Sequence, residues 1–415
     1  MPKRRRPCCN KPTSKSAVRP TLPTSVETAD MRMQNRKGAR MRLLQQGLIA
    51  LCALAAPLAG GQASAAAPGT ILHQEAIPGA PDGAQAYRVT YQSRTAKGDD
   101  VAVSGLIIVP AGTPPAAGRP VVAWAHPTTG VVPACAPSNS VLRFAMIPGL
   151  RDMLKQGFVV TATDYPGTGP GEVQPFLDGP AEARAVLDSV RAAARIAGSG
   201  AGPRFALWGH SQGGQAVLFA GATQADYAPE LQLAGVAAAA PATDLSALFR
   251  DDMGTKGGNN LTALALWSWA RTEAAPFEPI VKPEAAPAIE AVAAKCIDVL
   301  LTSPSKRAAD KVLATGFLTV PNVATVEPWR SIIARNSAGP LPKHVPLFLA
   351  QGGADVIVRP AVTQGYMKRQ CAAGGKVTLH SRPQTGHGWI AAKSAQAAVS
   401  WLADRFAGLP APDSC

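Results

Sequence analysis

The fold is decided by the stretch Leu207-Trp208-Gly209-His210-Ser211-Gln212-Gly213-Gly214, which a strand-like run precedes and a helix-like run follows. A strand that turns at once into a helix forces the residue at the turn into a strained backbone conformation. It also brings the residues on either side of the turn close together. Glycine at positions 209 and 213, in the pattern G-x-S-x-G, removes the Cβ atoms that would collide. The pattern predicts a nucleophilic Ser211 at the carboxyl edge of a sheet; a glycine-rich turn with a bystander serine is the alternative.

Strand-like and helix-like segments alternate along most of the chain. Several strand-like runs, such as Val121 to Ala125, are apolar at every position, which is typical of strands buried on both faces of a sheet. The expected strands are residues 84–94, 101–109, 121–125, 158–163, 204–207, 233–240, 345–350 and 376–381, and the expected helices are residues 141–156, 181–196, 215–220, 360–371 and 390–406. This alternation predicts an α/β fold, with a mostly parallel sheet flanked by helices on both faces.

The alternation breaks after the strand expected at 233–240. Residues 245–342 contain helix-like segments around 261–271, 288–301 and 305–318, but no clear strand. We interpret this segment as a helical cap, inserted between a first core segment at 66–244 and a second at 343–415. A separate small domain is the alternative, and the return of the sheet pattern after the segment disfavours it.

The first 65 residues have the pattern of an export signal. Arg40 and Arg42 supply a basic region, an apolar run from Leu43 to Leu58 follows, and Ala63-Ser64-Ala65 offers an A-x-A cleavage site. The run is short for a membrane span and ends in small residues, so cleavage near Ala65 is favoured over an uncleaved anchor. We therefore expect a secreted or periplasmic protein.

Composition and charge exclude some classes of partner. A hydrophobic content of 47% with both signs of charge present indicates a globular protein. The net charge is +14, but residues 1–65 hold 12 of the 41 basic and 2 of the 27 acidic residues, which leaves +4 for the rest. The sequence therefore gives little support to a nucleic-acid partner. It also lacks the G-x-G-x-x-G and P-loop patterns of nucleotide-binding proteins.

Four cysteines remain once the leader is set aside: Cys135, Cys296, Cys371 and Cys415. An even number in an exported chain indicates two disulfides, for which three pairings exist. A zinc site is the alternative, but no C-x-x-C spacing is present, so no metal is expected.

An acid and a histidine follow Ser211 in the order that nucleophilic catalysis on this kind of sheet requires. Asp355 comes after the penultimate expected strand and His387 after the last, in a loop flanked by glycines. The imidazole would take the proton from the serine hydroxyl, and the carboxylate would orient the imidazole. Asp164 is the rival acid, although its place before two glycines favours a role in a turn. Asp251 and Asp252 are expected on the surface of the cap.

The remaining five of the six histidines have other expected roles. His73 and His344 lie in segments expected to be solvated, His126 precedes the serine, His210 lies inside the motif and is expected to pack, and His380 falls within a strand.

A tetrahedral intermediate needs two N–H donors for its negatively charged oxygen. The first expected donor is the backbone N–H of Gln212, at the start of the helix after the serine. The second is expected from the loop His126-Pro127-Thr128-Thr129-Gly130, which follows the third expected strand. Proline has no N–H, so Thr128 is the first choice and Thr129 the second.

With these residues in place, residues 70–410 resemble the secretory lipase family, the fungal lipase A-type enzymes and their bacterial relatives within the α/β-hydrolases. The resemblance depends on four motifs taken together: Trp124-Ala125-His126-x-Thr128-Thr129-Gly130, Cys135-Ala136-Pro137-Ser138, Asp164-Tyr165-Pro166-Gly167-Thr168-Gly169 and Gly209-His210-Ser211-Gln212-Gly213-Gly214. Pro127 departs from the pattern, because bacterial relatives usually have glycine there.

The resemblance implies an α/β-hydrolase fold and hydrolysis of carboxylic esters through an acyl-enzyme, without a cofactor. It implies a helical cap and the disulfides Cys135–Cys296 and Cys371–Cys415. The substrate would be a small-molecule or lipid ester, with transient contact to a lipid interface; the sequence does not indicate an oligomeric state. Four apolar residues of the cap are candidates for lining an acyl site, or else form the cap's own core: Leu264, Leu266, Trp267 and Trp269.

Two other functions remain as alternatives. A serine peptidase or amidase on the same fold is the nearer one, although no propeller-like repeat precedes the core. A non-catalytic, hydrolase-like binding protein is the other, and it would require a broken triad.

Overall fold

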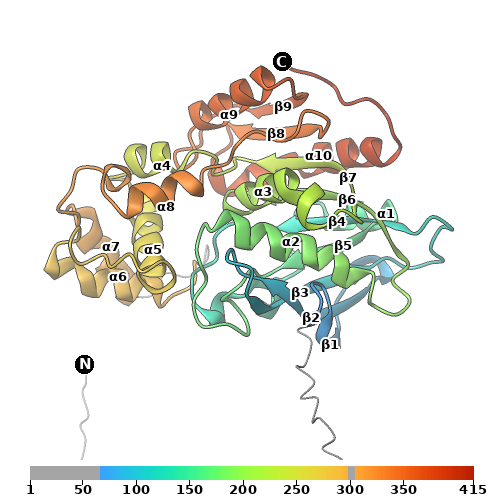
Figure 1. Cartoon of the computed structure of the whole chain (residues 1–415), viewed down its shortest axis with the longest axis horizontal. Helices are drawn as coiled ribbons and strands as arrows, with labels where there is room; N and C mark the ends of the chain where they lie inside the picture. Colours follow the sequence, from blue (N-terminus) through green and yellow to red (C-terminus); the bar gives the residue numbers. More distant parts are fainter. Residues whose placement is uncertain (1–65, 298–303) are drawn as a thin grey trace, which may run out of the picture. The chain divides into compact units, whose positions relative to one another are not determined.

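A nine-stranded sheet forms the centre of the fold (Figure 1). The computed structural model of the protein describes residues 66–297 and 304–415. The strands are β1 (Ile71–Ile77), β2 (Gln85–Arg94), β3 (Asp100–Val109), β4 (Arg119–Ala125), β5 (Val159–Thr163), β6 (Ala201–His210), β7 (Gln232–Ala239), β8 (Leu347–Gly352) and β9 (Val377–Arg382). Their order in space is β1-β2-β3-β5-β4-β6-β7-β8-β9.

Three pairs at one end of the sheet, β1–β2, β2–β3 and β3–β5, are antiparallel, and every pair from β5 across to β9 is parallel. Strand β4 shows why its sequence is apolar throughout. Val121, Ala123 and Ala125 face one hydrophobic core, whereas Val122 and Trp124 face the other. The prediction of a mostly parallel sheet buried on both faces is confirmed.

Helices cover both faces of the sheet. The helices around it are α1 (Leu150–Lys155), α2 (Gly179–Ala193), α3 (Gln212–Tyr227), α9 (Pro360–Ala372) and α10 (Ile390–Phe406). Helices α2 and α3 contribute to the core on one face, and α1 and α10 contribute to the core on the other. Because β4 and β6 are central, the connections after them meet in the middle of the carboxyl edge of the sheet.

The segment between β7 and β8 is helical. It contains α4 (Leu245–Asp251), α5 (Lys256–Thr272), α6 (Ala286–Ala293), α7 (Pro304–Ala314) and α8 (Trp329–Arg335), drawn from yellow-green to orange in Figure 1. Apart from an isolated bridge between Val281 and Leu318, its described residues form no β-structure. These helices share a third hydrophobic core, to which Phe176 and Leu177 of the sheet's own loops also belong.

Several expected boundaries were wrong. The expected helix at 141–156 is limited to α1, because Gly149 adopts a left-handed conformation (φ 81°) and the residues before it form turns. Strand β1 was missed, and His73, expected before the sheet, lies within it. Helix α6 ends at Ala293, and the rest of the helix expected at 288–301 lies partly outside the described residues. The leader and its cleavage site also lie outside them.

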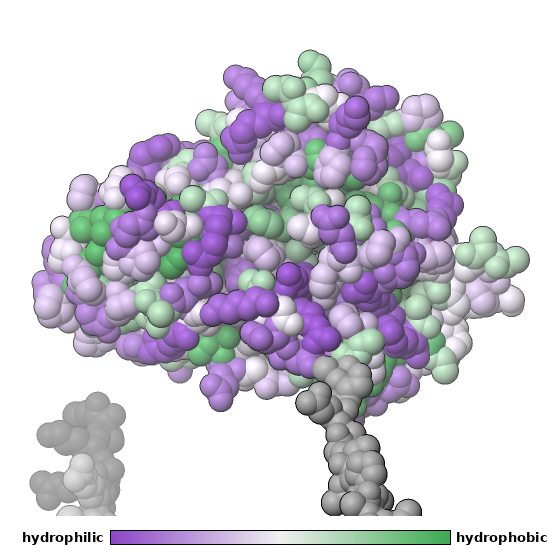
Figure 2. All heavy atoms as spheres, viewed as in Figure 1, coloured by the Kyte–Doolittle hydropathy of each residue, from purple (hydrophilic) through white to green (hydrophobic). Residues whose placement is uncertain are grey.

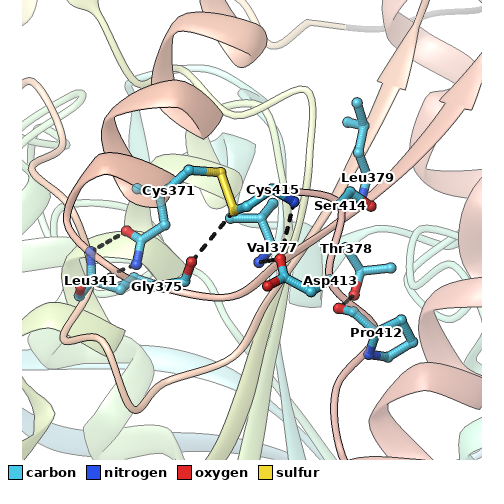
Figure 3. The surroundings of a disulfide bond; sticks show 11 residues. Leu341, Cys371, Gly375, Val377, Thr378, Leu379, Pro412, Asp413, Ser414 and Cys415 are labelled. Atoms are coloured by element: carbon cyan, nitrogen blue, oxygen red, sulfur yellow. Dashed lines mark hydrogen bonds between the residues drawn. A yellow bond between two sulfur atoms is a disulfide. The ribbon is translucent and has the colours of Figure 1, made fainter.

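The C-terminal tail is held along the edge strand β9 (Figure 3). Ser414 N–H donates to the Val377 carbonyl (2.6 Å) and Thr378 Oγ1 donates to the Pro412 carbonyl (2.7 Å). The Cys371–Cys415 disulfide joins the end of this tail to α9. The tail therefore covers part of an edge that would otherwise present unpaired backbone groups.

The surface on view is largely polar. On the face drawn in Figure 2, hydrophilic side chains predominate and hydrophobic ones form scattered groups. Among the described residues, none of the helices combines the length and the apolar character that crossing a membrane requires.

Candidate active site

Ser211 lies at a sharp turn between β6, which ends at His210, and α3, which begins at Gln212. Its backbone angles are φ 57° and ψ −117°, and its N–H donates to the Ala239 carbonyl of β7 (3.0 Å). A Cβ atom on Gly209 would lie 2.2 Å from the Gly213 carbonyl oxygen. One on Gly213 would lie 2.0 Å from the Ala125 carbonyl oxygen of β4. The close approach that explains the two glycines is confirmed.

Ser211, His387 and Asp355 form a chain of hydrogen bonds. His387 Nε2 lies 2.8 Å from Ser211 Oγ, and His387 Nδ1 lies 2.8 Å from Asp355 Oδ2. Asp355 follows β8 and His387 follows β9, so the ends of three parallel strands bring the side chains together. With the imidazole proton on Nδ1, Nε2 accepts from the serine hydroxyl, which is the arrangement for general-base activation of the serine.

The carboxylate of Asp355 is fixed by its own loop. Its Oδ1 accepts hydrogen bonds from the N–H groups of Ile357 and Val358, both at 2.9 Å. Only 3% of the residue is exposed. Oδ2 is therefore left to face His387, and the orientation of the imidazole is set by the backbone of the loop.

A second histidine, His210, packs against His387 and contacts its backbone. The His210 ring lies against His387 with their centroids 4.9 Å apart, and its Nε2 is 3.0 Å from the His387 carbonyl oxygen. Burial, together with the nearby His387, holds the pKa of His210 well below its ordinary value. A neutral ring that donates to the His387 backbone positions that residue without adding a positive charge beside it. The expected packing role of His210 agrees with this geometry.

The three expected N–H donors for the negatively charged oxygen differ in whether they line the pocket at Ser211. Gln212 is the first residue of α3, so its N–H has no acceptor within the helix. Thr128 lines the same pocket as Ser211 and Gln212. Thr129 is not among the residues that line this pocket, and its carbonyl accepts the N–H of Ile297 (2.8 Å). The geometry thus favours Thr128 over Thr129.

The Cys135–Cys296 disulfide holds this loop against the helical segment. A Cβ atom on Gly130 would lie 2.5 Å from Cys135 Sγ and 3.2 Å from Cys296 Cα, so the loop, the disulfide and residue 296 are in direct contact. Both disulfides in the structure join the pairs that the family resemblance implied.

Glu182 is a buried acid behind Gln212 that the sequence did not reveal. It comes from α2, and its Oε1 accepts from Gln212 Nε2 (2.6 Å). Burial raises the pKa of Glu182 well above its usual range, and the hydrogen bond from Gln212 opposes the rise. The contact holds the side chain of Gln212 against α2.

Asp164, the rival acid, has a structural role. Its carboxylate accepts from Ser104 Oγ (2.6 Å) and from both the N–H (2.9 Å) and the Oγ (2.5 Å) of Ser138. These bonds join β3 to the short turn after Cys135. Asp164 takes no part in the hydrogen-bond chain of Ser211, which agrees with the expected role in a turn.

The pocket at Ser211 is narrow and mostly apolar, with a volume of about 50 Å³. Helices α4 and α5 and the loop after β8 supply about half of the lining residues, and the ends of other core strands and loops supply the others. Its lining residues are Thr128, Phe176, Leu177, Ser211, Gln212, Ala242, Leu245, Leu248, Phe249, Asp252, Gly258, Leu261, Thr262, Ile357 and Val358. The volume has room for a few water molecules and is well below the 300–1,000 Å³ that is typical of drug-sized ligands.

Of the two roles considered for four apolar residues of the cap, lining an acyl site or forming the cap's own core, the structure supports the second. Leu264, Leu266, Trp267 and Trp269 belong to the core of the helical segment, and none lines the pocket. Trp269 Nε1 donates to the Phe176 carbonyl (2.9 Å). Helix α4, which does line the pocket, had a usable signal in the sequence. Asp244 caps it by accepting from Ala247 N–H, and Leu245, Leu248 and Phe249 follow at helical spacing.

Asp252 was also misplaced. It was expected on the surface of the cap, but only 4% of it is exposed and it lies in the wall of the pocket. Asp251, its neighbour, forms an ion pair with Arg250 and is partly exposed. In the described ranges, no three His, Cys, Asp or Glu side chains converge as a metal site would require.

The chain belongs to the secretory lipase family, whose model matches residues 144–414. This membership confirms the resemblance stated from the motifs, and it supports an ester hydrolase of the lipase type. A relative from Mycobacterium tuberculosis (strain CDC 1551 / Oshkosh), named a probable inactive lipase, is 26% identical over 369 residues. These are 84% of this chain and 80% of that protein. Lipase 5 of Candida albicans is 28% identical over 277 residues, 63% of this chain but only 58% of its own length.

Solved structures show the same fold. Candida antarctica lipase A in its closed state superposes with a TM-score of 0.70 at 18% identity, covering 84% of both chains. The rice cell wall degrading esterase LipA from Xanthomonas oryzae superposes with a TM-score of 0.63 at 20% identity, covering 83% of this chain and 99% of that one. Both likenesses support the assignment of the α/β-hydrolase fold.

Proposed function

We propose that this protein is an exported serine hydrolase that cleaves carboxylic esters with Ser211 as nucleophile, His387 as general base and acid, and Asp355 as the residue that orients His387. The hydrogen-bond chain from Ser211 Oγ through His387 to Asp355, with both distances at 2.8 Å, is the observation that carries the proposal. Membership in the secretory lipase family supports the ester as the substrate class.

The reaction would proceed in two stages. Ser211 Oγ attacks the ester carbonyl carbon while His387 Nε2 takes the hydroxyl proton, and the carbonyl oxygen becomes negatively charged. The N–H groups of Gln212 and Thr128 would donate to this oxygen, each contributing about 3–4 kcal/mol to the stability of the transition state. His387 then gives its proton to the leaving alcohol, and the acyl group remains on Ser211.

In the second stage, a water molecule hydrolyses the acyl-enzyme. His387 takes a proton from a water molecule, whose oxygen attacks the acyl carbon. The second tetrahedral intermediate collapses, the proton returns to Ser211 Oγ, and the carboxylic acid leaves. Atoms and charges balance without a metal or a redox cofactor.

The proposal also assigns a role to each segment of the chain. Residues 66–244 and 343–415 would form the catalytic core and residues 245–342 a helical cap, whose helices α4 and α5 contribute to the pocket. The leader at residues 1–65 would be removed near Ala65 on export. The two disulfides agree with an oxidising compartment.

The probable inactive relative makes a non-catalytic protein the alternative to test. An intact hydrogen-bond chain in this protein favours activity. The test is hydrolysis of p-nitrophenyl butyrate by the wild type, by Ser211→Ala, and by His344→Ala as a control at an exposed histidine. We expect the first and third to be active and Ser211→Ala to lose at least about 10³-fold in kcat. Equal turnover by Ser211→Ala and wild type would overturn the proposal.

A panel of acyl esters beside peptide amides separates an esterase from a peptidase. Preferential cleavage of the amides would favour the peptidase alternative.

A further inference from the structure

A buried carboxyl group in the wall of the Ser211 pocket has no hydrogen-bond partner for one of its oxygens among the residues that the structure describes. Asp252 follows α4 and is 4% exposed, among neighbours that include Leu248, Phe249 and Leu261. Its Oδ1 is fully buried and has no hydrogen-bond partner within the described residues. Buried polar groups in proteins are almost always hydrogen-bonded, so this oxygen requires an explanation.

The local fold does not need this carboxyl group. The backbone of Asp252 already has its partners, since its N–H donates to the Leu248 carbonyl (3.0 Å) and its carbonyl accepts from Thr255 Oγ1 (2.8 Å). The first turn of α5 packs closely against Asp252, since a Cβ atom on Gly258 would lie only 2.4 Å from Asp252 Cβ. Asp252 is therefore packed closely against the start of α5, and it also lines the pocket.

Burial, modified by the charged groups around it, sets the pKa of Asp252. Burial raises the pKa of Asp252 from its ordinary value to about 7, Arg359 opposes the rise, and Asp251 and Asp355 add to it. Arg359 does not bond to Asp252; its Nη2 donates to the Asp251 carbonyl (2.5 Å). Near neutral pH the group is thus a mixture of carboxyl and carboxylate, and both forms accept a hydrogen bond.

We propose that Asp252 is a specificity-determining residue that accepts a hydrogen bond from a hydroxyl group of the ester substrate, on the part that enters the Ser211 pocket. The inference rests on the proposed function. An unsubstituted alkyl chain would leave the carboxyl unpaired against apolar surface, whereas a hydroxyl would satisfy it. A cationic group on the substrate is disfavoured as the partner of Asp252, because the positive charge of Arg359 already acts on Asp252 and would repel such a group. The preferred substrate is therefore a hydroxylated ester, not one with plain alkyl chains only.

The test compares kcat/KM for esters that differ only in a hydroxyl group. p-Nitrophenyl hexanoate is measured beside its 3-hydroxy and 6-hydroxy derivatives, which place the hydroxyl on the acyl side. Propyl hexanoate is measured beside 2,3-dihydroxypropyl hexanoate, which places it on the alcohol side. We expect the wild type to prefer the hydroxylated member of at least one pair by about tenfold or more.

Three variants test whether the preference for hydroxylated esters depends on Asp252. Asp252→Leu is expected to abolish the preference, so that the plain and hydroxylated members of each pair are cleaved with equal kcat/KM. Asp252→Asn keeps a carbonyl oxygen as acceptor and is expected to retain most of the preference. Asp251→Asn, one residue away and outside the pocket lining, is expected to leave it unchanged. Thermal unfolding of each variant shows whether it is folded, and Asp252→Ala replaces Asp252→Leu if the latter is not.

Each outcome decides the question. A wild type that shows no preference in any pair, or a preference that survives in Asp252→Leu, overturns the role of Asp252 and leaves the proposed function standing. A wild type that cleaves none of the esters overturns the proposed function, and this inference with it.

Discussion

Replacing Asp355 by asparagine tests the hydrogen-bond chain at its buried end. The N–H groups of Ile357 and Val358 both point at Oδ1, each at 2.9 Å, so an asparagine must place its amide oxygen there. Its NH₂ group then faces His387 Nδ1, where Oδ2 stood at 2.8 Å. That NH₂ group donates to Nδ1 and forces the imidazole proton onto Nε2, which faces Ser211. In this tautomer His387 cannot accept the serine proton.

We expect kcat for p-nitrophenyl butyrate to fall about 10⁴-fold in Asp355→Asn, equivalent to about 5.5 kcal/mol of transition-state stabilisation. The stability of the fold should change little, because both backbone hydrogen bonds keep their acceptor. Asp251→Asn serves as the matched control and should retain wild-type kcat. A folded Asp355→Asn whose kcat lies within tenfold of the wild type would refute this account of the site.

Three further outcomes follow from the structure. First, the narrow pocket predicts that kcat/KM for p-nitrophenyl esters is highest at butyrate or hexanoate and falls at least about tenfold by laurate; a maximum at laurate or beyond would contradict the pocket as the acyl site. Second, replacing both Cys371 and Cys415 by serine should lower the free energy of unfolding by about 2–4 kcal/mol with little change in kcat, measured by urea unfolding, since the bond restrains the tail far from Ser211. Third, the folded state keeps the proton of Asp252 up to a pKa of about 7, whereas the unfolded chain releases it at the ordinary value. Stability should therefore fall by about 2 kcal/mol as pH rises from about 4 to 8, after allowance for solvent screening, and Asp252→Asn should lack this loss.

The features that the sequence predicts well are those with a strict physical requirement. Gly209 and Gly213 are needed because backbone atoms occupy the space of a side chain, and this requirement is visible in the spacing of five residues. The continuous apolar runs predicted the parallel strands, because burial on both faces leaves no polar position. The order of Ser211, Asp355 and His387 followed from the topology, since each comes after a strand whose carboxyl end meets the same edge of the sheet.

The helices and strands that the sequence did not predict are not fixed by a strict physical requirement of this kind. Strand β1 has the sequence ILHQEAI and is mostly exposed, so it shows no clear alternation of apolar and polar residues. Helix α8 is only seven residues long, too short for a periodic pattern to stand out. Gly149 stopped the first expected helix in a region whose apolar residues had helical spacing.

The pocket was the least predictable part of the site. Its wall comes from segments that are distant in the sequence and meet only through tertiary packing, among them the loop at Thr128, the loop at Phe176, the α4–α5 region and the loop after Asp355. Asp252 was therefore assigned to the surface from its type alone. Glu182 was missed for the same reason, since it contacts Gln212 across two helices.

The nucleophilic role of Ser211 can be tested most directly by covalent trapping. Diethyl p-nitrophenyl phosphate should transfer one diethylphosphoryl group to each chain, with release of p-nitrophenolate and a parallel loss of esterase activity. Peptide mass spectrometry should place the group on Ser211, and Ser211→Ala should take up none. Full inactivation with the label on another residue, or retained ester hydrolysis by Ser211→Ala, would contradict the central claim.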